Sequence, residues 1–301
     1  MRIVSFLPSA TEILYAIGLG DQVVGITHEC DYPPDVRTKP VLTRCAFDSE
    51  RMTQKEIDDE VRRLAREEKS LYEIHDEKLR QANPDLIVTQ DLCHVCAITP
   101  REVDRAIGIL PGKPKVVSLN PKLLEDVFSD MHLLSDITDA QSGKLIEQLQ
   151  GRVRDVLKQT LPLPKVTVGC IEWFDPIWRT GHWVPEMVQL AGGVEMFAEI
   201  GKSSRTLPWD ELQEKNPDIL IFMPCGSSLE KTKQQFQRAA DKYEWKKLKA
   251  FQNHRAYFVD ANSYFSRSGP RLVEGLELLA EILHPDYFTN MAPVDSYLRI
   301  D

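Results

Sequence analysis

The feature that most constrains the fold is a short unit that occurs twice in the chain. QANPDLIVTQ at 81–90 and QEKNPDILIFMP at 213–224 share the end of a helix, an Asn-Pro-Asp turn and a run of apolar residues typical of a buried strand. Each copy is followed by a loop that carries cysteine. Such a repeat predicts two lobes built on the same α/β plan, and 301 residues are enough for two ordinary domains.

Strand-like apolar runs alternate with helical patterns along the whole chain. The strand-like runs are RIVSFL, VVGIT, DLIVTQ and KVVSLN in the first half, and KVTVGCIEW, DILIFMP and RAYFVDA in the second. We therefore predict an α/β fold with two Rossmann-like lobes, formed by residues 1–120 and 164–301. Residues 121–163 are expected to form a helical connection. Within it, the pattern over residues 139–160 predicts one long backbone helix of about 33 Å that joins both lobes.

Unusual residues gather directly after the predicted strands. Ligands of parallel α/β sheets bind at the carboxyl ends of the strands, so loops from both lobes are expected to face a common cleft. One such segment, IEWFDPIWRTGHWVPE at 171–186, contains Trp173, Trp178 and Trp183 at five-residue spacing. No single helix or strand would bury three rings at this spacing on one face. We expect Trp178 to line the cleft and Trp173 and Trp245 to pack in the core, while both alternatives stay open for Trp183.

Several segments of the chain match the sequence pattern of a known family. They are LPSATEILYAIGLGDQVVGIT, CDYP and YFSRSGPRLVEGLELLAEIL, together with THECDYPP, TQDLCHVCA, GHWVPEMVQLAGG and MPCG. Over nearly its whole length the chain resembles the cobalamin-binding proteins of bacterial ABC importers, within the helical-backbone group of periplasmic binding proteins. The resemblance implies two α/β lobes joined by one long helix, with a ligand cleft between them. It also implies the non-catalytic binding of cobalamin or a related corrinoid.

The resemblance further implies which residues contact the ligand. The corresponding positions are occupied here by Tyr32, Trp178, Trp209, Phe265 and Arg267. A corrin is a broad and nearly flat ring, for which aromatic faces give a large contact area at a low cost in side-chain entropy. We add two candidates from the same segment, Trp183 and His182. The imidazole of His182 could be an axial ligand to cobalt, or it could bond to the next helical turn.

The importer proteins also carry one acidic residue on each lobe that docks on permease arginines. Glu102 and Glu211 lie near these places without aligning with them. The sequence therefore supports an ABC permease as a partner less strongly than it supports the corrinoid ligand.

Four residues provide an alternative metal site. Cys93 and Cys96 have the spacing of a zinc knuckle or a redox pair, and His28 and Cys30 could complete a Cys₃His set for zinc. The other interpretation is that Cys93 and Cys96 are thiols that line the cleft. The competing functions are therefore a metal-handling protein or metalloenzyme, and a binder of haem or another metal chelate. We expect no enzyme, because the chain has no Gly-x-Ser-x-Gly elbow, Walker loop or Gly-x-Gly-x-x-Gly motif after a strand.

Charge and hydropathy limit the partners. A net charge of −9 argues against nucleic acid, which needs a basic face, and no apolar stretch approaches the roughly 20 residues of a membrane span. We expect a monomer that does not insert into membranes. The first apolar run, IVSFL, is shorter than the apolar region of a signal peptide and is needed as a strand. We therefore expect a cytoplasmic protein with mainly free thiols, or a periplasmic one if translation starts upstream.

Overall fold

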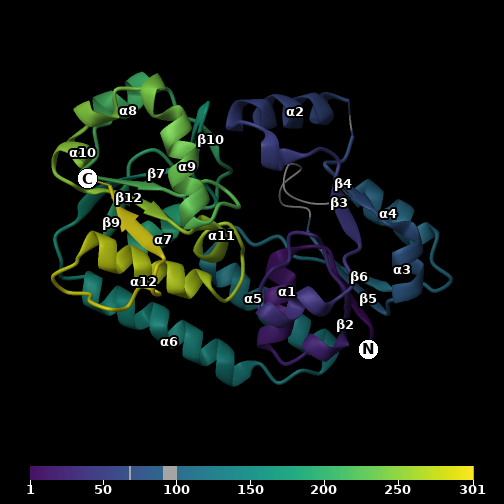
Figure 1. Ribbon diagram of the computed structural model, residues 1–301. Coiled ribbons are helices and arrows are strands. Elements are labelled where there is room, and N and C mark those ends of the chain that lie inside the picture. Colours follow the sequence, from purple (N-terminus) through teal and green to yellow (C-terminus); the bar gives the residue numbers. More distant parts are fainter. Residues whose placement is uncertain (68, 91–99, 301) are drawn as a thin grey trace. The chain divides into compact units, whose positions relative to one another are not determined.

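The computed structural model describes residues 1–67, 69–90 and 100–300. These residues form two compact units, each with a β-sheet of its own (Figure 1). Unit 1 contains residues 1–121 and 126–146, and unit 2 contains residues 122–125 and 147–301. The predicted α/β fold with two lobes is confirmed. The chain contributes residues 122–125 to unit 2, returns to unit 1, and enters unit 2 for the last time within helix α6 (Gly143–Thr160).

Unit 1 is built on a parallel sheet with the strand order β2-β1-β5-β6. Its central strand β5 is an unbroken apolar run because both faces of a parallel sheet are covered. The strands are β1 (Ile3–Ser5), β2 (Val23–Gly25), β5 (Leu86–Thr89) and β6 (Lys115–Ser118), and the helices are α1 (Pro8–Ala16), α3 (Asp76–Ala82), α4 (Pro100–Gly108) and α5 (Leu124–Thr138). An antiparallel pair, β3 (Thr43–Cys45) and β4 (Tyr72–Ile74), flanks helix α2 (Gln54–Arg66) in the sequence. Short 3-10 helices are η1 (Gly20–Gln22), η2 (Pro34–Thr38) and η3 (Ser49–Arg51).

Unit 2 is built on a mixed sheet with the strand order β10-β8-β7-β11-β12-β13, and β9 also pairs with β7. Strands β7, β9, β11 and β12 are parallel to one another, whereas β8, β10 and β13 are antiparallel additions. The strands are β7 (Val166–Phe174), β8 (Ile177–Arg179), β9 (Gly193–Glu195), β10 (Arg205–Thr206), β11 (Ile219–Phe222), β12 (Ala256–Val259) and β13 (Tyr297–Arg299). The helices are α7 (Val184–Leu190), α8 (Trp209–Lys215), α9 (Leu229–Ala239), η4 (Ala240–Lys242), η5 (Trp245–Lys247), α10 (Lys249–Gln252), α11 (Ala261–Tyr264) and α12 (Leu272–Leu283).

The two copies of the Asn-Pro-Asp turn end two helices in the same way. Asn83 follows α3 with φ of 40°, and Asn216 follows α8 with φ of 37°. Both residues therefore adopt the left-handed conformation, which asparagine tolerates better than most residues. Their backbone N–H groups donate to Leu79 O and Leu212 O at 3.1 and 3.0 Å. The predicted helix end and buried strand are thus confirmed in both copies.

The aspartate of each copy fixes the first strand of its own unit. Asp85 accepts a hydrogen bond from the backbone N–H of Arg2 at 2.7 Å, next to β1. Asp218 accepts one from the backbone N–H of Thr167 at 3.1 Å, in β7, and another from its hydroxyl at 2.7 Å. An ion pair with Lys249, together with the bonds from Thr167, lowers the pKa of the Asp218 carboxyl to about 2.

The predicted long helix begins later than expected. The hydroxyl of Thr138 donates to Leu134 O at 2.6 Å within α5, and the left-handed conformation of Asp139, with φ of 56°, follows the end of that helix. The prediction that a helix starts at residue 139 is therefore wrong, and α6 starts at Gly143. Its 18 residues correspond to about 27 Å. Within unit 2, α6 is bonded to α12 by Arg152, whose guanidinium donates to both oxygens of Glu277 at 2.8 and 2.6 Å.

None of the helices formed by the described residues has both the length and the apolar character needed to cross a bilayer.

The substitution Asp218→Ala tests whether the hydrogen bonds from Thr167 to Asp218 stabilise the start of β7. We expect it to lower the free energy of unfolding by about 1–3 kcal/mol at neutral pH, because a charge-assisted bond and a bond to a strand end are lost. The pKa of Asp218 is lower in the folded protein than its ordinary value, so this stabilisation is complete above about pH 4 and is lost as the pH falls towards 2. Denaturant unfolding at neutral and acidic pH measures it. Asp241→Ala, an exposed aspartate of η4, is the matched control, and equal losses in both variants would contradict the assignment.

Candidate functional site

The carboxyl ends of the parallel strands in unit 2 carry loops that bond to one another. Ligands of α/β folds bind at this edge of a sheet, which makes it the candidate site of unit 2. Three hydrogen bonds join the end of β7 and the loops after β11 and β12. They run from Cys225 N to Glu172 O at 3.2 Å, from Gly226 N to Ser266 Oγ at 3.0 Å, and from Asn262 N to Ser227 O at 3.0 Å.

Two half-buried tryptophans lie opposite each other where β8 folds back on β7. Trp173 and Trp178 are register partners of this antiparallel pair. Directly opposite residues of neighbouring strands point to the same face, so both side chains are on one side of this strand pair. The prediction that Trp173 packs in the core did not include this pairing, because β8 was not foreseen. The signal that could have revealed it is Asp175-Pro176, a turn-forming pair between two strand-like runs.

The antiparallel register of β8 and β10 continues beyond the ends of both strands. The backbone N–H of His182 donates to Lys202 O at 2.6 Å, and that of Gly201 donates to His182 O at 2.9 Å. Gly181 makes this approach possible, because a Cβ atom there would lie only 2.4 Å from Ser204 N and 2.5 Å from Lys202 O. The segment after β8 is therefore held against the segment before β10.

His182 lies in this contact with a left-handed backbone, at φ of 53°. Its ring is half-buried and lies 5.7 Å from the ring of Trp183. Burial, followed by the positive charge of Lys122, lowers the pKa of the imidazole. The ring is therefore neutral at neutral pH, which is the form able to coordinate a metal or accept a hydrogen bond. A contact between His182 and a ligand stays a prediction.

Trp183 and Phe265 connect two segments of the candidate site through a buried hydrogen bond. Their exposed fractions are 8% and 3%, and Trp183 Nε1 donates to Phe265 O at 2.9 Å. This bond ties the start of α7 to the loop before α12. Both side chains are thus buried, and ligand contacts by Trp183 and Phe265 stay predictions.

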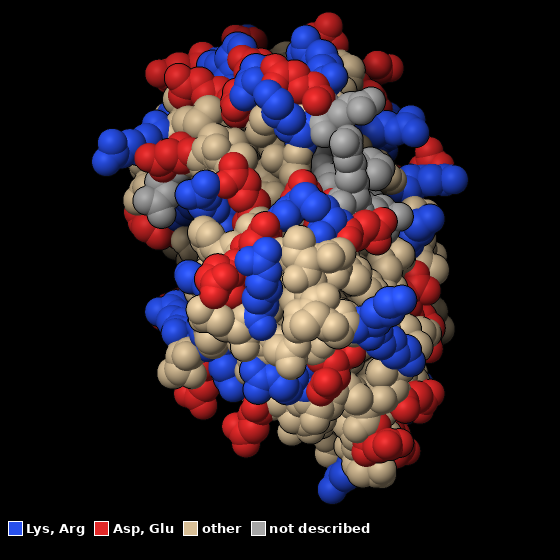
Figure 2. Space-filling view, turned by 90° about the vertical axis from the view of Figure 1, so that its right-hand side faces the viewer, with Lys and Arg blue, Asp and Glu red and all other residues tan. Residues whose placement is uncertain are grey.

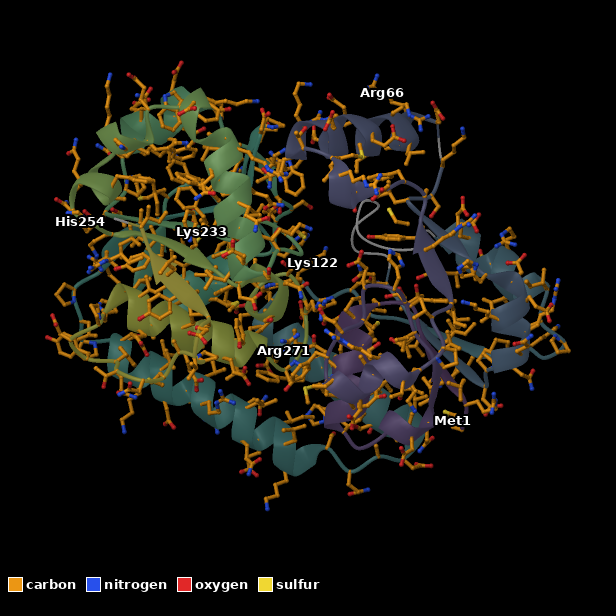
Figure 3. The ribbon with its side chains drawn as sticks, viewed as in Figure 1. Met1, Arg66, Lys122, Lys233, His254 and Arg271 are labelled. Atoms are coloured by element: carbon orange, nitrogen blue, oxygen red, sulfur yellow. The ribbon has the colours of Figure 1, made fainter. Side chains whose placement is uncertain are left out.

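Arg267 and Arg271 lie in and beside the loop that precedes α12. Arg267 is 8% exposed, and its Nη2 donates to Asn262 Oδ1 at 3.0 Å. Arg271, labelled in Figure 3, directly precedes α12. Its guanidinium lies 5.9 Å from the ring centre of Tyr264. Arg267 thus belongs to the bonded loop cluster at the carboxyl edge of unit 2.

Trp209 contributes to the aromatic core of unit 2. Its half-buried ring is stacked on Tyr243 at 5.0 Å and meets Trp245 edge to face at 5.0 Å. Trp245 is buried in the same cluster, which confirms its predicted packing role.

Tyr32 lies in unit 1 with 42% of its surface exposed. Ligand contacts by Trp209 and Tyr32 stay predictions.

The side chains of His28 and Cys30 have separate partners. His28 Nδ1 and Thr43 Oγ1 share a hydrogen bond of 2.8 Å, while Cys30 Sγ lies 3.1 Å from Thr11 Oγ1 and 3.3 Å from Thr27 Oγ1. Both side chains therefore take part in hydrogen bonds within unit 1.

The other two proposed ligands, Cys93 and Cys96, lie outside the described residues. Within residues 1–67, 69–90 and 100–300, no group of three His, Cys, Asp or Glu side chains is placed to hold a metal ion. The described residues thus give the zinc alternative no support.

Surface charges are largely balanced locally. Glu102 forms an ion pair with Arg105 at 3.0 Å, and Glu211 forms one with Lys215 at 2.9 Å. On the face shown in Figure 2, basic and acidic side chains are interspersed. Such a mixture, with the net charge of −9, does not favour binding of nucleic acid phosphates.

Residues 3–263 match the family described as periplasmic binding protein, and the chain belongs to this family. A substrate-binding lipoprotein of an ABC transporter from Bacillus subtilis, itself uncharacterised, is 27% identical over 298 residues, covering 95% of this chain and 81% of the relative. A vitamin B12-binding protein of Vibrio cholerae is 24% identical over 292 residues, covering 94% and 88%. These relatives are named as binding proteins, not as enzymes.

Solved structures show the same fold. The periplasmic vitamin B12 binding protein of Vibrio cholerae superposes with a TM-score of 0.67 at 22% identity, covering 94% of this chain and 96% of that one. A periplasmic heme binding protein from Pseudomonas aeruginosa superposes with a TM-score of 0.73 at 15% identity, covering 100% and 99%. At these identities the likeness concerns the fold alone.

The expected cytoplasmic location is wrong. The relatives are a lipoprotein of an ABC transporter and periplasmic binding proteins, which act outside the cytoplasm. The error came from treating the short apolar run at the start of the sequence as a guide to location.

Gly181→Ala tests the close contact that shapes the site. The added methyl would meet the backbone at Ser204 and Lys202, which cannot move without breaking the two bonds at His182. We expect a loss of about 1–3 kcal/mol in the free energy of unfolding, as for other overpacked positions. Thermal or denaturant unfolding measures this loss.

Gly151→Ala is the matched control. Gly151 lies inside α6, where the nearest neighbour of an added Cβ is the flexible end of Arg154 at 3.8 Å. Alanine favours the helix, so this variant should be unchanged or slightly stabilised. A Gly181→Ala protein as stable as the Gly151→Ala protein would contradict the close contact.

Proposed function

We propose that the protein binds cobalamin or a related corrinoid without catalysing a reaction, as the solute-binding component of an ABC importer. The observation that carries the proposal is the half-buried pair Trp173 and Trp178, which are register partners at the carboxyl end of β7. This pair supplies an aromatic surface where ligands of α/β folds bind.

The chemistry of a corrin suits such a surface. Each tryptophan can bury about 150–250 Å², and an indole has few rotatable bonds to immobilise when a ligand covers it. Arg267 lies in the neighbouring loop cluster, where its Nη2 donates to Asn262 Oδ1, and a guanidinium group is chemically suited to the amide oxygens or phosphate of a corrinoid. Trp183 and Phe265 would act by holding this cluster together.

Sequence similarity favours a corrinoid over haem, the alternative chelate. The vitamin B12-binding relative is similar over 94% of the chain at the level of sequence, whereas the heme-binding protein of Pseudomonas aeruginosa is similar in fold alone. The Bacillus subtilis relative is named as part of an ABC transporter, which supports a permease as the protein partner.

Trp178→Ala and Trp173→Ala test the aromatic surface. We expect each variant to bind cobalamin about 10- to 100-fold more weakly than the wild type, because a large aromatic anchor is lost. Equilibrium titration followed by the corrin absorbance and by tryptophan fluorescence measures the affinity. Haem added as a competitor reports whether the surface prefers the corrin.

Tyr287→Ala is the control, because this tyrosine is 64% exposed in the loop after α12. It should leave the affinity unchanged. Unaltered binding of cobalamin in both tryptophan variants would refute the proposed surface, and tighter binding of haem than of cobalamin would refute the ligand.

A further inference from the structure

Two arginines lie directly opposite each other at the edge of the sheet in unit 2. Arg179 at the end of β8 and Arg205 at the start of β10 are register partners of an antiparallel pair. Like charges at such positions destabilise a sheet, because directly opposite side chains point to the same face. The repulsion between the two arginines therefore lowers the stability of the fold unless another interaction offsets it.

The pair lies at the margin of the apolar core. Side chains alternate along a strand, so Arg179 is on the same side as Ile177, and Arg205 is on the same side as Leu207. Both of these aliphatic residues are buried in the core of unit 2. Trp178 and its partner Thr206 point to the other side. Arg179, which is half-buried, thus lies beside a region of low dielectric, where unbalanced charge is costly.

Neither arginine has a carboxylate partner among the described residues. Arg179 is half-buried, and its Nη1 donates to the backbone oxygen of Phe197. Arg205 is exposed, and within the described part of the chain its side chain forms no hydrogen bond or ion pair. Glu199, which lies between β9 and β10, forms no ion pair with either of them in the described structure.

Two guanidinium groups on paired strands, without an acidic partner among the described residues, leave several N–H donors unused.

We propose that Arg179 and Arg205 form a binding site for an oxyanion, namely a phosphate or carboxylate group. The planar guanidinium groups suit two oxygens of one anion, and the bound anion offsets the repulsion between them. The site is on the opposite side of β8 from the tryptophan pair. The anion is either a free ion in solution or a group carried by the ligand of the proposed function, such as the phosphodiester of cobalamin.

Thermal unfolding in phosphate tests the site without reference to cobalamin. At low ionic strength, inorganic phosphate should raise the melting temperature of the wild type more than sodium chloride at equal ionic strength, because binding stabilises the folded state. Arg205→Gln should remove this difference. It should also raise the melting temperature in anion-free buffer, because the like-charged pair is gone.

Arg238→Gln is the matched control. Arg238 is an exposed arginine of α9 in the same unit, whose side chain forms no hydrogen bond or ion pair within the described residues. This variant should respond to phosphate as the wild type does. If Arg205 only supported the fold, its substitution would lower the melting temperature and leave the response to phosphate in place.

A second comparison identifies the source of the anion and rests on the proposed function. Cobinamide lacks the nucleotide tail and its phosphodiester. If the ligand supplies the anion, Arg205→Gln should weaken the binding of cobalamin by about tenfold or more and leave that of cobinamide unchanged. If the anion is free, both affinities should stay unchanged while the phosphate response is lost.

The two proposals can fail separately. A protein that does not bind cobalamin but shows the phosphate response refutes the corrinoid ligand and supports the anion site. The anion site is refuted if phosphate acts no differently from chloride and Arg205→Gln leaves the affinities for cobalamin and cobinamide in the same ratio.

Discussion

The close contact between Gly181 and residues 202–204 is the constraint on which the candidate site depends. A Cβ atom on Gly181 would lie 2.4 Å from Ser204 N, so only glycine lets the two segments lie this close. The contact extends the register of β8 and β10, which makes Arg179 the neighbour of Arg205. Strand β8 is also paired with β7, and this second register makes Trp178 the neighbour of Trp173. The two registers thus place a tryptophan pair on one side of β8 and an arginine pair on the other.

The two units share a local rule that is independent of the site. In each unit an asparagine in the left-handed conformation ends a helix, and the aspartate two residues later binds the backbone N–H at the start of the first strand. The aspartate therefore links two neighbouring parallel strands at their amino ends. The loops of the candidate site follow the opposite, carboxyl ends of the strands in unit 2, where they are fixed by bonds to one another.

The sequence revealed what is encoded locally and missed what depends on strand pairing. The repeated turn, the apolar strands and the packing of Trp245 follow from short-range patterns, and the structure contains them. The partnership of Trp173 with Trp178 was missed, because the five-residue spacing says nothing about a chain that folds back at Asp175-Pro176. The start of the long helix was predicted at residue 139, before the observed start at Gly143. Asp139 instead follows the end of α5 in a left-handed backbone conformation, which its side chain did not reveal. The location was misjudged because a short first strand carries no information about transport.

The central claim is that a corrinoid covers the tryptophan pair at the end of β7. Amide hydrogen exchange, measured on the whole protein with and without cobalamin, tests ligand and place together. The account predicts slower exchange in residues 171–183 when cobalamin is present, with little change in the exposed helix α2. Exchange in residues 171–183 that is the same with and without saturating cobalamin would contradict it.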